Sequence, residues 1–248
     1  MQIFSPLEQF EVNILFTLPF FTAFDISITN STVYMFLSFS FFSGLLLLGT
    51  FRVFIIPTKF QVVSELIYQF IFDMVKTQSS LKGQQFFPII FVTFGFVLLS
   101  NLLGLTPYAF TPTSHIIVTF LLAFSFFVGL TIVGFMRQGV SFLKLFLPSG
   151  VPAAILPLMV LIEIMSYCIR PISLSVRLFA NMLAGHTLLH IVAGFGVKLL
   201  DNGILFAMLP VILLLAITLL EFGIAFLQAY VFVILLSIYL NDSISAGH

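Results

Sequence analysis

Two apolar segments near the C-terminus constrain the fold more than any other feature of this sequence. They cover roughly residues 152–199 and 204–240, with Asp-Asn-Gly at 201–203 between them. As α-helices they would be about 70 and 55 Å long, whereas the hydrocarbon core of a bilayer is about 30 Å thick. Each segment is therefore either one steeply tilted helix or two shorter spans. We expect two tilted helices in an antiparallel hairpin, because the charged residues within them need partners along most of their length.

Composition excludes a soluble fold. Of 248 residues, 60% are hydrophobic and 7% are charged, whereas about a quarter are charged in soluble domains. The nine Lys and Arg residues form no cluster suited to nucleic acid. The single cysteine, Cys168, excludes a disulfide framework and is expected to be an inert packed thiol. The 34 phenylalanines and the absence of tryptophan hint at biased coding in an organelle genome.

Three shorter apolar runs precede the long segments. They cover residues 33–56, 86–105 and 115–137, and each is long enough to span a bilayer. The predicted fold class is therefore an all-α polytopic membrane protein, with about five membrane helices in a single membrane domain over residues 1–248.

Residues 58–82 have a different pattern from the spans. Apolar residues recur there at helical spacing, and charged residues such as Glu65 and Asp73 occupy the other side. This pattern predicts an amphipathic helix that lies along the membrane interface, with its charges on a solvated face. The N-terminal segment, residues 1–33, has no Lys or Arg and lacks the basic start of a cleavable signal peptide.

The distribution of basic residues predicts the orientation. The connections 52–82 and 137–150 hold most of the Lys and Arg, whereas the opposite side has only Lys198. Basic loops stay on the cytoplasmic or equivalent side of a membrane. The N-terminus is therefore expected on the translocated side and the C-terminus on the opposite one.

Polar residues inside the long segments are the candidate functional residues. Residues 170–190 read RPISLSVRLFANMLAGHTLLH, and residues 221–232 read EFGIAFLQAYVF. Arginine stays ionised, so an intramembrane arginine is costly and indicates function. With Gly203 as the turn, residues of the two helices meet when their numbers sum to about 406. This register pairs Arg177 with Gln228 and His186 with Glu221.

Three motifs carry a family resemblance that covers nearly the whole chain. RLFANMLAGH at 177–186, EFGIAFLQAYVF at 221–232 and NLLGLTPYAFTPTSH at 101–115 resemble subunit a of F-type ATP synthases. The order of His186 and Glu221 is similar to that in mitochondrial members. The resemblance implies a proton-translocating stator subunit of the mitochondrial inner membrane, with its N-terminus towards the intermembrane space and its C-terminus towards the matrix.

The resemblance also implies partners and roles. The partners are a rotor ring of small hairpin subunits, each with a membrane-embedded carboxylate, the peripheral stalk and other membrane subunits, and the lipid bilayer. Two offset half-channels load and unload the ring carboxylates, and Arg177 lies between them. The remaining residues with implied roles in proton translocation are Glu221, His186 and Gln228 near the intermembrane half-channel, Asn181 beside the rotor, and Glu163 and Ser173 near the matrix half-channel. Nucleotide chemistry belongs to other subunits, and no cofactor is required.

The physics of a fixed cation agrees with that role. A permanent positive charge opposite a passing carboxylate favours its ionised form, so the proton must leave first. Arginine also cannot relay a proton between the half-channels. The alternative is that Arg177 forms a structural ion pair, but no acidic residue lies three or four positions away from it.

Several residues keep two interpretations. Glu221 and His186 either serve proton transfer or only satisfy one another. Arg170 either lies in the proton pathway or caps the helix and extends its charge towards the interface. His115 either has a channel role or sits at the interface, and Asn101 either has a channel role or stabilises a helix end.

A zinc site is a separate hypothesis. His186 and His190 lie four positions apart and, with Glu221 and a water, would make an acceptable zinc ligand set. The alternative is that His190 only packs or bonds a backbone carbonyl group.

Two other functional classes compete with the stator. A proton-coupled secondary transporter would also hide Arg, Glu and His in mid-membrane, but its internal repeat is missing here. A purely structural anchor does not explain intramembrane arginines. The sequence has no phosphate-binding loop and no nucleophile elbow, so we expect no catalysis by this chain itself.

Overall fold

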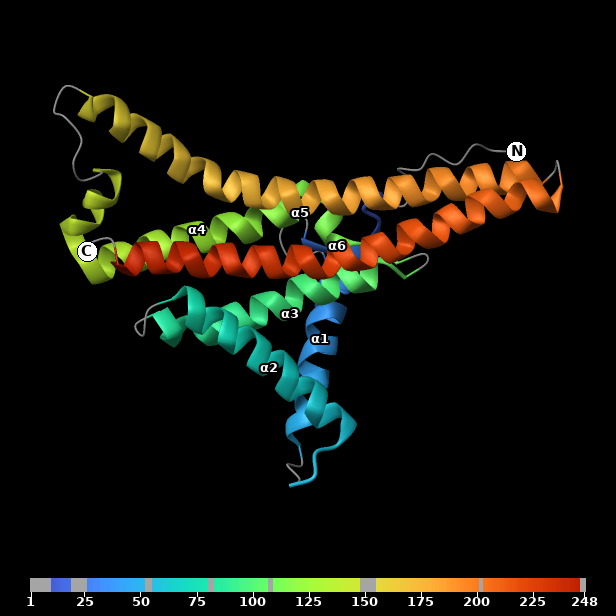
Figure 1. The fold of residues 1–248 in the computed structure, drawn as a ribbon, viewed down its shortest axis with the longest axis horizontal. Helices are drawn as coiled ribbons and strands as arrows, with labels where there is room; N and C mark the ends of the chain where they lie inside the picture. Colours follow the sequence, from blue (N-terminus) through green and yellow to red (C-terminus); the bar gives the residue numbers. More distant parts are fainter. Residues whose placement is uncertain are drawn as a thin grey trace. The chain divides into compact units, whose positions relative to one another are not determined.

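A computed structural model describes residues 10–18, 26–51, 55–79, 83–106, 109–147, 155–200 and 203–245. Helices dominate these residues (Figure 1). The α-helices are α1 (Asn30–Thr50), α2 (Lys59–Gln78), α3 (Phe87–Gly104), α4 (Ile116–Gln138), α5 (Leu156–Leu200) and α6 (Ile204–Ser245). Short 3-10 helices cover η2 (Gly83–Phe86), η3 (Pro112–Ser114) and η4 (Gly139–Phe146).

The predicted fold class is confirmed. Five helical stretches among the described residues are long and apolar enough to cross a membrane, namely Asn30–Thr50, Gly83–Gly104, Ile116–Leu143, Leu156–Leu200 and Met208–Ile244. α5 and α6 are each one continuous helix (Figure 1), so neither long segment is broken into two spans. Pro171 and Pro210 lie inside these helices without ending them.

The first helix begins at Asn30 rather than at residue 33, for a local reason. The Thr29 amide donates to the Thr32 hydroxyl at 3.0 Å, and the Thr32 amide approaches the Thr29 hydroxyl at 3.5 Å. This reciprocal pairing satisfies amide groups that a helix start leaves without partners. The helix ends at Thr50 instead of residue 56.

The N-terminal segment contains a hairpin that was not predicted. β1 (Ile14–Leu18) pairs with β2 (Ile26–Thr29) in antiparallel fashion, with an irregularity between Ile14 and Phe16. Asn30, the first residue of α1, bonds the chain just before the hairpin. Its backbone amide donates to the Asn13 carbonyl at 3.1 Å, and its side-chain nitrogen donates to the Glu11 carbonyl at 3.1 Å.

The chain divides into two compact units. Unit 1 comprises Met1–Gly44, Gly95–Ile116 and Leu178–Ala229, and unit 2 comprises Leu45–Phe94, Ile117–Arg177 and Tyr230–His248. In unit 1, α1 and α3 pack closely: the Ser100 hydroxyl donates to Ser38 at 3.1 Å, and Gly95 leaves the space that the Phe42 ring fills.

Unit 2 has a core rich in aromatic and branched side chains. Ile71 and Val75 of α2 are almost fully buried, as is Phe94 of α3. The Tyr68 ring meets the Phe87 ring at 5.0 Å between centroids. The amphipathic helix predicted at residues 58–82 is therefore α2, whose N-cap Thr58 accepts from the Gln61 amide at 3.4 Å. Its position along a membrane surface stays a prediction.

Candidate functional site

The hairpin of α5 and α6 has the expected register within unit 1. A Cβ atom on Gly185 would lie 2.6 Å from the Glu221 carboxylate, and one on Gly196 would lie 3.5 Å from Pro210. The residue numbers of both pairs sum to 406, the value expected from the sequence. Gly203 makes the turn with φ of 127°, which favours glycine, and its amide donates to the Leu200 carbonyl at 3.1 Å. Asp201 and Asn202 lie outside the described residues.

Glu221 and His186 are buried side by side in this hairpin. Their side chains are only 5% and 8% exposed. Both line a cavity of about 10 Å³, room for roughly one water molecule. The cavity is bounded by Leu105, Asn181, Met182, Gly185, His186, Glu221 and Ile224. Within the described part of the chain neither carboxylate oxygen of Glu221 has a hydrogen-bond partner, so a water in this cavity would satisfy a group that is costly to bury alone.

A second polar pair lies in the same unit. The Asn181 amide group donates to the Gln228 side-chain oxygen at 3.0 Å. Gln228 is 4% exposed, whereas Asn181 is exposed on α5. Both candidate residues therefore belong to one hydrogen-bonded pair across the hairpin. The expected pairing of Arg177 with Gln228 joins the two units and stays a prediction.

The segment after α3 supports His186 from another side. The Thr111 hydroxyl lies 3.2 Å from the His186 Nε2 atom, and the Phe10 and His186 rings pack edge to face with 6.3 Å between centroids. Sequence reasoning missed Thr111. The only available signal was the polar run TPTS before the span at residues 115–137, and nothing in it points to a residue 75 positions away.

Asn101 braces this segment. It is fully buried, its side-chain nitrogen donates to the Ala225 carbonyl at 3.4 Å, and its oxygen accepts from the Thr113 hydroxyl at 2.9 Å. The amide thus ties α3, the segment before α4 and α6 together. These contacts favour the structural interpretation of Asn101.

An Asn101→Leu variant is expected to be less stable with its proton conductance per assembled complex little changed. The substitution leaves the Ala225 carbonyl and the Thr113 hydroxyl buried without this partner, at a cost of about 1–3 kcal/mol for a lost buried partner. The temperature of unfolding in detergent should fall, while Ser43→Ala, which removes only an exposed local bond, should leave it unchanged. An unfolding temperature equal to wild type would remove the brace role.

His115 packs where unit 1 ends, just before α4. Its ring stacks on Phe110 with 5.1 Å between centroids and 18° between planes. Burial lowers the pKa of the His115 imidazole, against an opposing hydrogen bond with the Phe10 backbone. A neutral, stacked ring agrees with a packing role, one of its two expected interpretations.

Arg170 is held by three side chains in unit 2. Its guanidinium lies 3.4 Å from Asp242, 4.8 Å from the Tyr239 ring centroid and 5.5 Å from the Tyr167 ring centroid. The Tyr167 hydroxyl is 2.7 Å from the Thr131 hydroxyl. Asp242 was missed, because the expected helix ended at residue 240.

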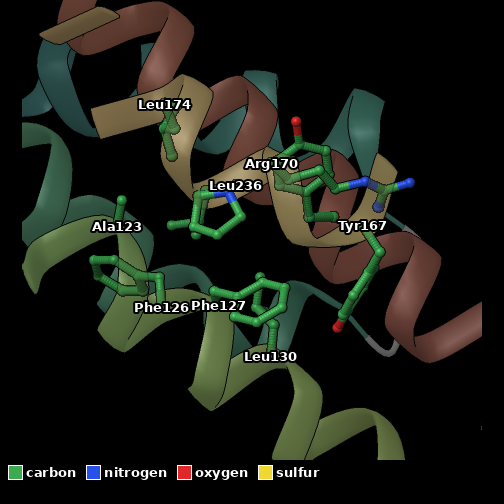
Figure 2. A pocket seen from close by; sticks show the side chains of 10 residues that line it. Ala123, Phe126, Phe127, Leu130, Tyr167, Arg170, Leu174 and Leu236 are labelled. Carbon is green, nitrogen blue, oxygen red and sulfur yellow. The ribbon is translucent and has the colours of Figure 1, made fainter. Parts of the chain in front are cut away.

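An apolar cavity of about 20 Å³ adjoins Arg170 and is lined by residues of α4, α5 and α6. Figure 2 shows the α4 side chains Phe126 and Phe127 on one side of it.

The other expected residues of unit 2 have fewer contacts. Arg177 and Ser173 are exposed on α5, and Glu163 is partly exposed. Among the residues that the structure describes, Arg177 takes part in no ion pair. Cys168 is exposed rather than packed, so the expectation of a packed thiol is wrong for the isolated chain.

The expected zinc ligands do not gather. No group of three or more His, Cys, Asp and Glu side chains capable of holding a metal occurs among the described residues. His186 and Glu221 are adjacent, but His190 is exposed. In the observed register residue 190 is level with position 216, about 7 Å along the helix from Glu221. The prediction combined the spacing of the two histidines with a register that sets Glu221 across from both, whereas the observed register brings only His186 beside Glu221.

Comparisons with known proteins agree with one another. A family model described as ATP synthase A chain matches residues 31–241. The chain is 49% identical over 244 residues to ATP synthase subunit a of Pelagibacter ubique, which covers 98% of this chain and 99% of that one. It is 47% identical over 247 residues to ATP synthase subunit a of Nitrobacter winogradskyi, which covers 98% of this chain and 99% of that one. It is 46% identical over 247 residues to ATP synthase subunit a of Acanthamoeba castellanii, which covers 99% of this chain and 100% of that one.

Proposed function

This chain belongs to the ATP synthase A chain family, and from that premise we propose that it is the non-catalytic subunit that conducts protons past the rotor of an F-type ATP synthase. A membrane component of ATP synthase is not a self-contained carrier, so the secondary transporter is no longer a competing function. The proposed partners are a ring of small hairpin subunits with embedded carboxylates and the peripheral stalk with the other membrane subunits.

The observation that carries the proposal is the buried pair of Glu221 and His186. A carboxylate and an imidazole are the two side chains best suited to take up and release protons near neutral pH. Here they share a water-sized cavity in a hairpin of membrane-spanning length. A transmembrane hairpin needs no such group for stability, because an ionisable side chain in the membrane is costly.

Two half-channels would flank a fixed charge. Glu221 and His186, with the Asn181–Gln228 pair near them, would line the half-channel on the translocated side. Glu163 and Ser173 would line the one on the opposite side. Arg177 would separate the two, since an exposed guanidinium can attract a passing ring carboxylate but cannot relay its proton.

We place the protein in the mitochondrial inner membrane, with its N-terminus towards the intermembrane space. The abundance of phenylalanine, the absence of tryptophan and the order of His186 and Glu221 support this location. The basic connections 52–82 and 137–150 support the orientation. The high identity to bacterial relatives makes a bacterial inner membrane the alternative.

A Glu221→Gln variant tests the proposal. Glutamine keeps the shape and removes the titrating group, so passive proton flux through the reconstituted membrane sector should fall at least tenfold, as expected for the loss of an acid–base group. Flux is measured as dye quenching in vesicles under a potassium diffusion potential. The matched control is Glu65→Gln on α2, which should conduct normally. Equal flux in Glu221→Gln and wild type would overturn the proposal.

A further inference from the structure

We propose that Thr111 is a positioning residue that holds the His186 ring by its Nε2 atom, so that Nδ1 is the nitrogen that exchanges protons in the site. This inference rests on the proposed function of His186. The bond joins residues from the segment before α4 and from α5, at 3.2 Å, and both side chains are buried, with 3% and 8% exposed.

The local backbone leaves the Thr111 hydroxyl available for this bond. Thr111 precedes η3 in the capping position, yet its side chain makes no capping hydrogen bond. Pro112 follows, and a residue before proline is restricted to extended conformations. Thr111 has φ of −100° and ψ of 104°, in agreement with that restriction. The hydroxyl is therefore directed by the backbone and is not consumed by the short helix it precedes.

Neighbouring residues fix the position of Thr111. Gly104 lies against it so closely that a Cβ atom there would overlap the Thr111 side chain. The Ser114 hydroxyl donates to the Thr111 carbonyl at 2.6 Å. Gly104 and Ser114 thus restrict the side chain and the backbone of Thr111 directly.

A hydroxyl suits a histidine that changes protonation state. When Nδ1 exchanges its proton, Nε2 keeps its hydrogen in both states, and the Thr111 hydroxyl oxygen can accept from it throughout. A carboxylate could accept the same bond, but it would place a second negative charge beside the imidazole, whereas the hydroxyl is neutral. The other groups near the ring are Glu221 across the cavity, His190 one turn along α5 and the apolar Phe10 ring. Thr111 is the hydroxyl among them, and it can keep the ring in one orientation while Nδ1 gains and loses a proton.

The Thr111→Ala and Thr111→Ser variants test the inference, because they differ only in the hydroxyl. Proton flux per assembled complex should fall about five- to tenfold in Thr111→Ala, the effect of one lost hydrogen bond, and should recover largely in Thr111→Ser. Gly104→Ala should reproduce the Thr111→Ala defect, since it displaces the same side chain. Thr106→Val, which removes an exposed hydroxyl that donates to the Leu103 carbonyl, should conduct as wild type.

A comparison with Thr113 separates positioning from stability. Thr113 lies two residues further along the same segment, and its hydroxyl donates to the Asn101 side-chain oxygen. Thr113→Ala should lower the unfolding temperature without lowering flux per assembled complex. Equal flux losses in Thr113→Ala and Thr111→Ala, or no recovery in Thr111→Ser, would overturn the inference. A wild-type flux in His186→Ala would instead overturn the proposed function on which it rests.

Discussion

An Arg177→Ala complex is expected to assemble and to make no ATP from a proton gradient. Arg177 is exposed on α5 and has no ion pair among the described residues, so its removal leaves no buried partner uncompensated. Without the cation, a ring carboxylate that passes α5 keeps its proton, because no positive charge favours the ionised form. Rotation then no longer depends on proton release, and synthesis stops. ATP yield after an acid–base jump measures this, with native gels reporting assembly.

Two further arginine variants sharpen this test. Arg137→Gln on α4 removes an exposed cation that bonds Gln85 at 2.7 Å, and it should synthesise ATP normally. Arg177→Lys keeps a charge but loses the planar fork and can deprotonate when desolvated, so it should also fail. Synthesis near the wild-type rate in an assembled Arg177→Ala complex would exclude Arg177 as the separating charge.

Arg170 provides a contrast, seven residues away on the same helix. It is engaged by Asp242 and two tyrosine rings, so its removal should weaken the packing of unit 2. The Coulomb part of that loss is small, because the Arg170 and Asp242 side chains are 20% and 37% exposed and solvent screens the pair. The two arginines are therefore expected to differ in what their removal changes: Arg170 has partners in the described structure and affects packing, whereas Arg177 has no ion pair there and affects proton transfer.

Much of the fold could be predicted because apolar length is a strong signal. The expected spans at 86–105 and 115–137 correspond closely to α3 and α4, whose bounds follow from hydrophobic runs alone. Helix ends were harder, since side-chain hydrogen bonds decide them. Thr29 and Thr32 start α1 early, and α6 extends beyond residue 240 to include Asp242, which pairs with Arg170. The β-hairpin was missed, because a short strand pair carries no periodicity comparable to a membrane helix.

The candidate site could be predicted in part, because a hairpin with one turn residue has an arithmetic register. That register predicts His186 opposite Glu221, and the contact of Gly185 with Glu221 agrees with it. The Thr111 bond could not be predicted, since tertiary packing brings it from 75 positions away. The expected zinc site used the same register for both histidines, but that register brings residue 185 against Glu221, so His186 lies beside the carboxylate and His190 lies more than a turn away.

Gly185→Ala is expected to block proton flux while the chain still folds. The added Cβ atom would lie 2.6 Å from the Glu221 Oε1 atom, 3.0 Å from Cδ and 3.2 Å from Cγ, so the carboxylate must shift. The side chain is buried, and the adjoining cavity of about 10 Å³ has room for roughly a water, not for a displaced carboxyl group. We expect flux to fall as far as in Glu221→Gln, although no titrating group has been changed.

The matched control for this prediction is Gly194→Ala on the same helix, where the added carbon would meet no described atom within 4 Å beyond its chain neighbours and the helix's own backbone. Alanine in a helix interior is favoured over glycine by about 1 kcal/mol, so the control should be no less stable than wild type and should conduct normally. If Gly185→Ala acted only through helix propensity, it too would conduct. A conducting Gly185→Ala complex would mean that Glu221 tolerates displacement and that its position beside His186 is not required. A loss of proton flux in Gly185→Ala but not in the control would mean that the carboxylate needs the space that the glycine leaves for it.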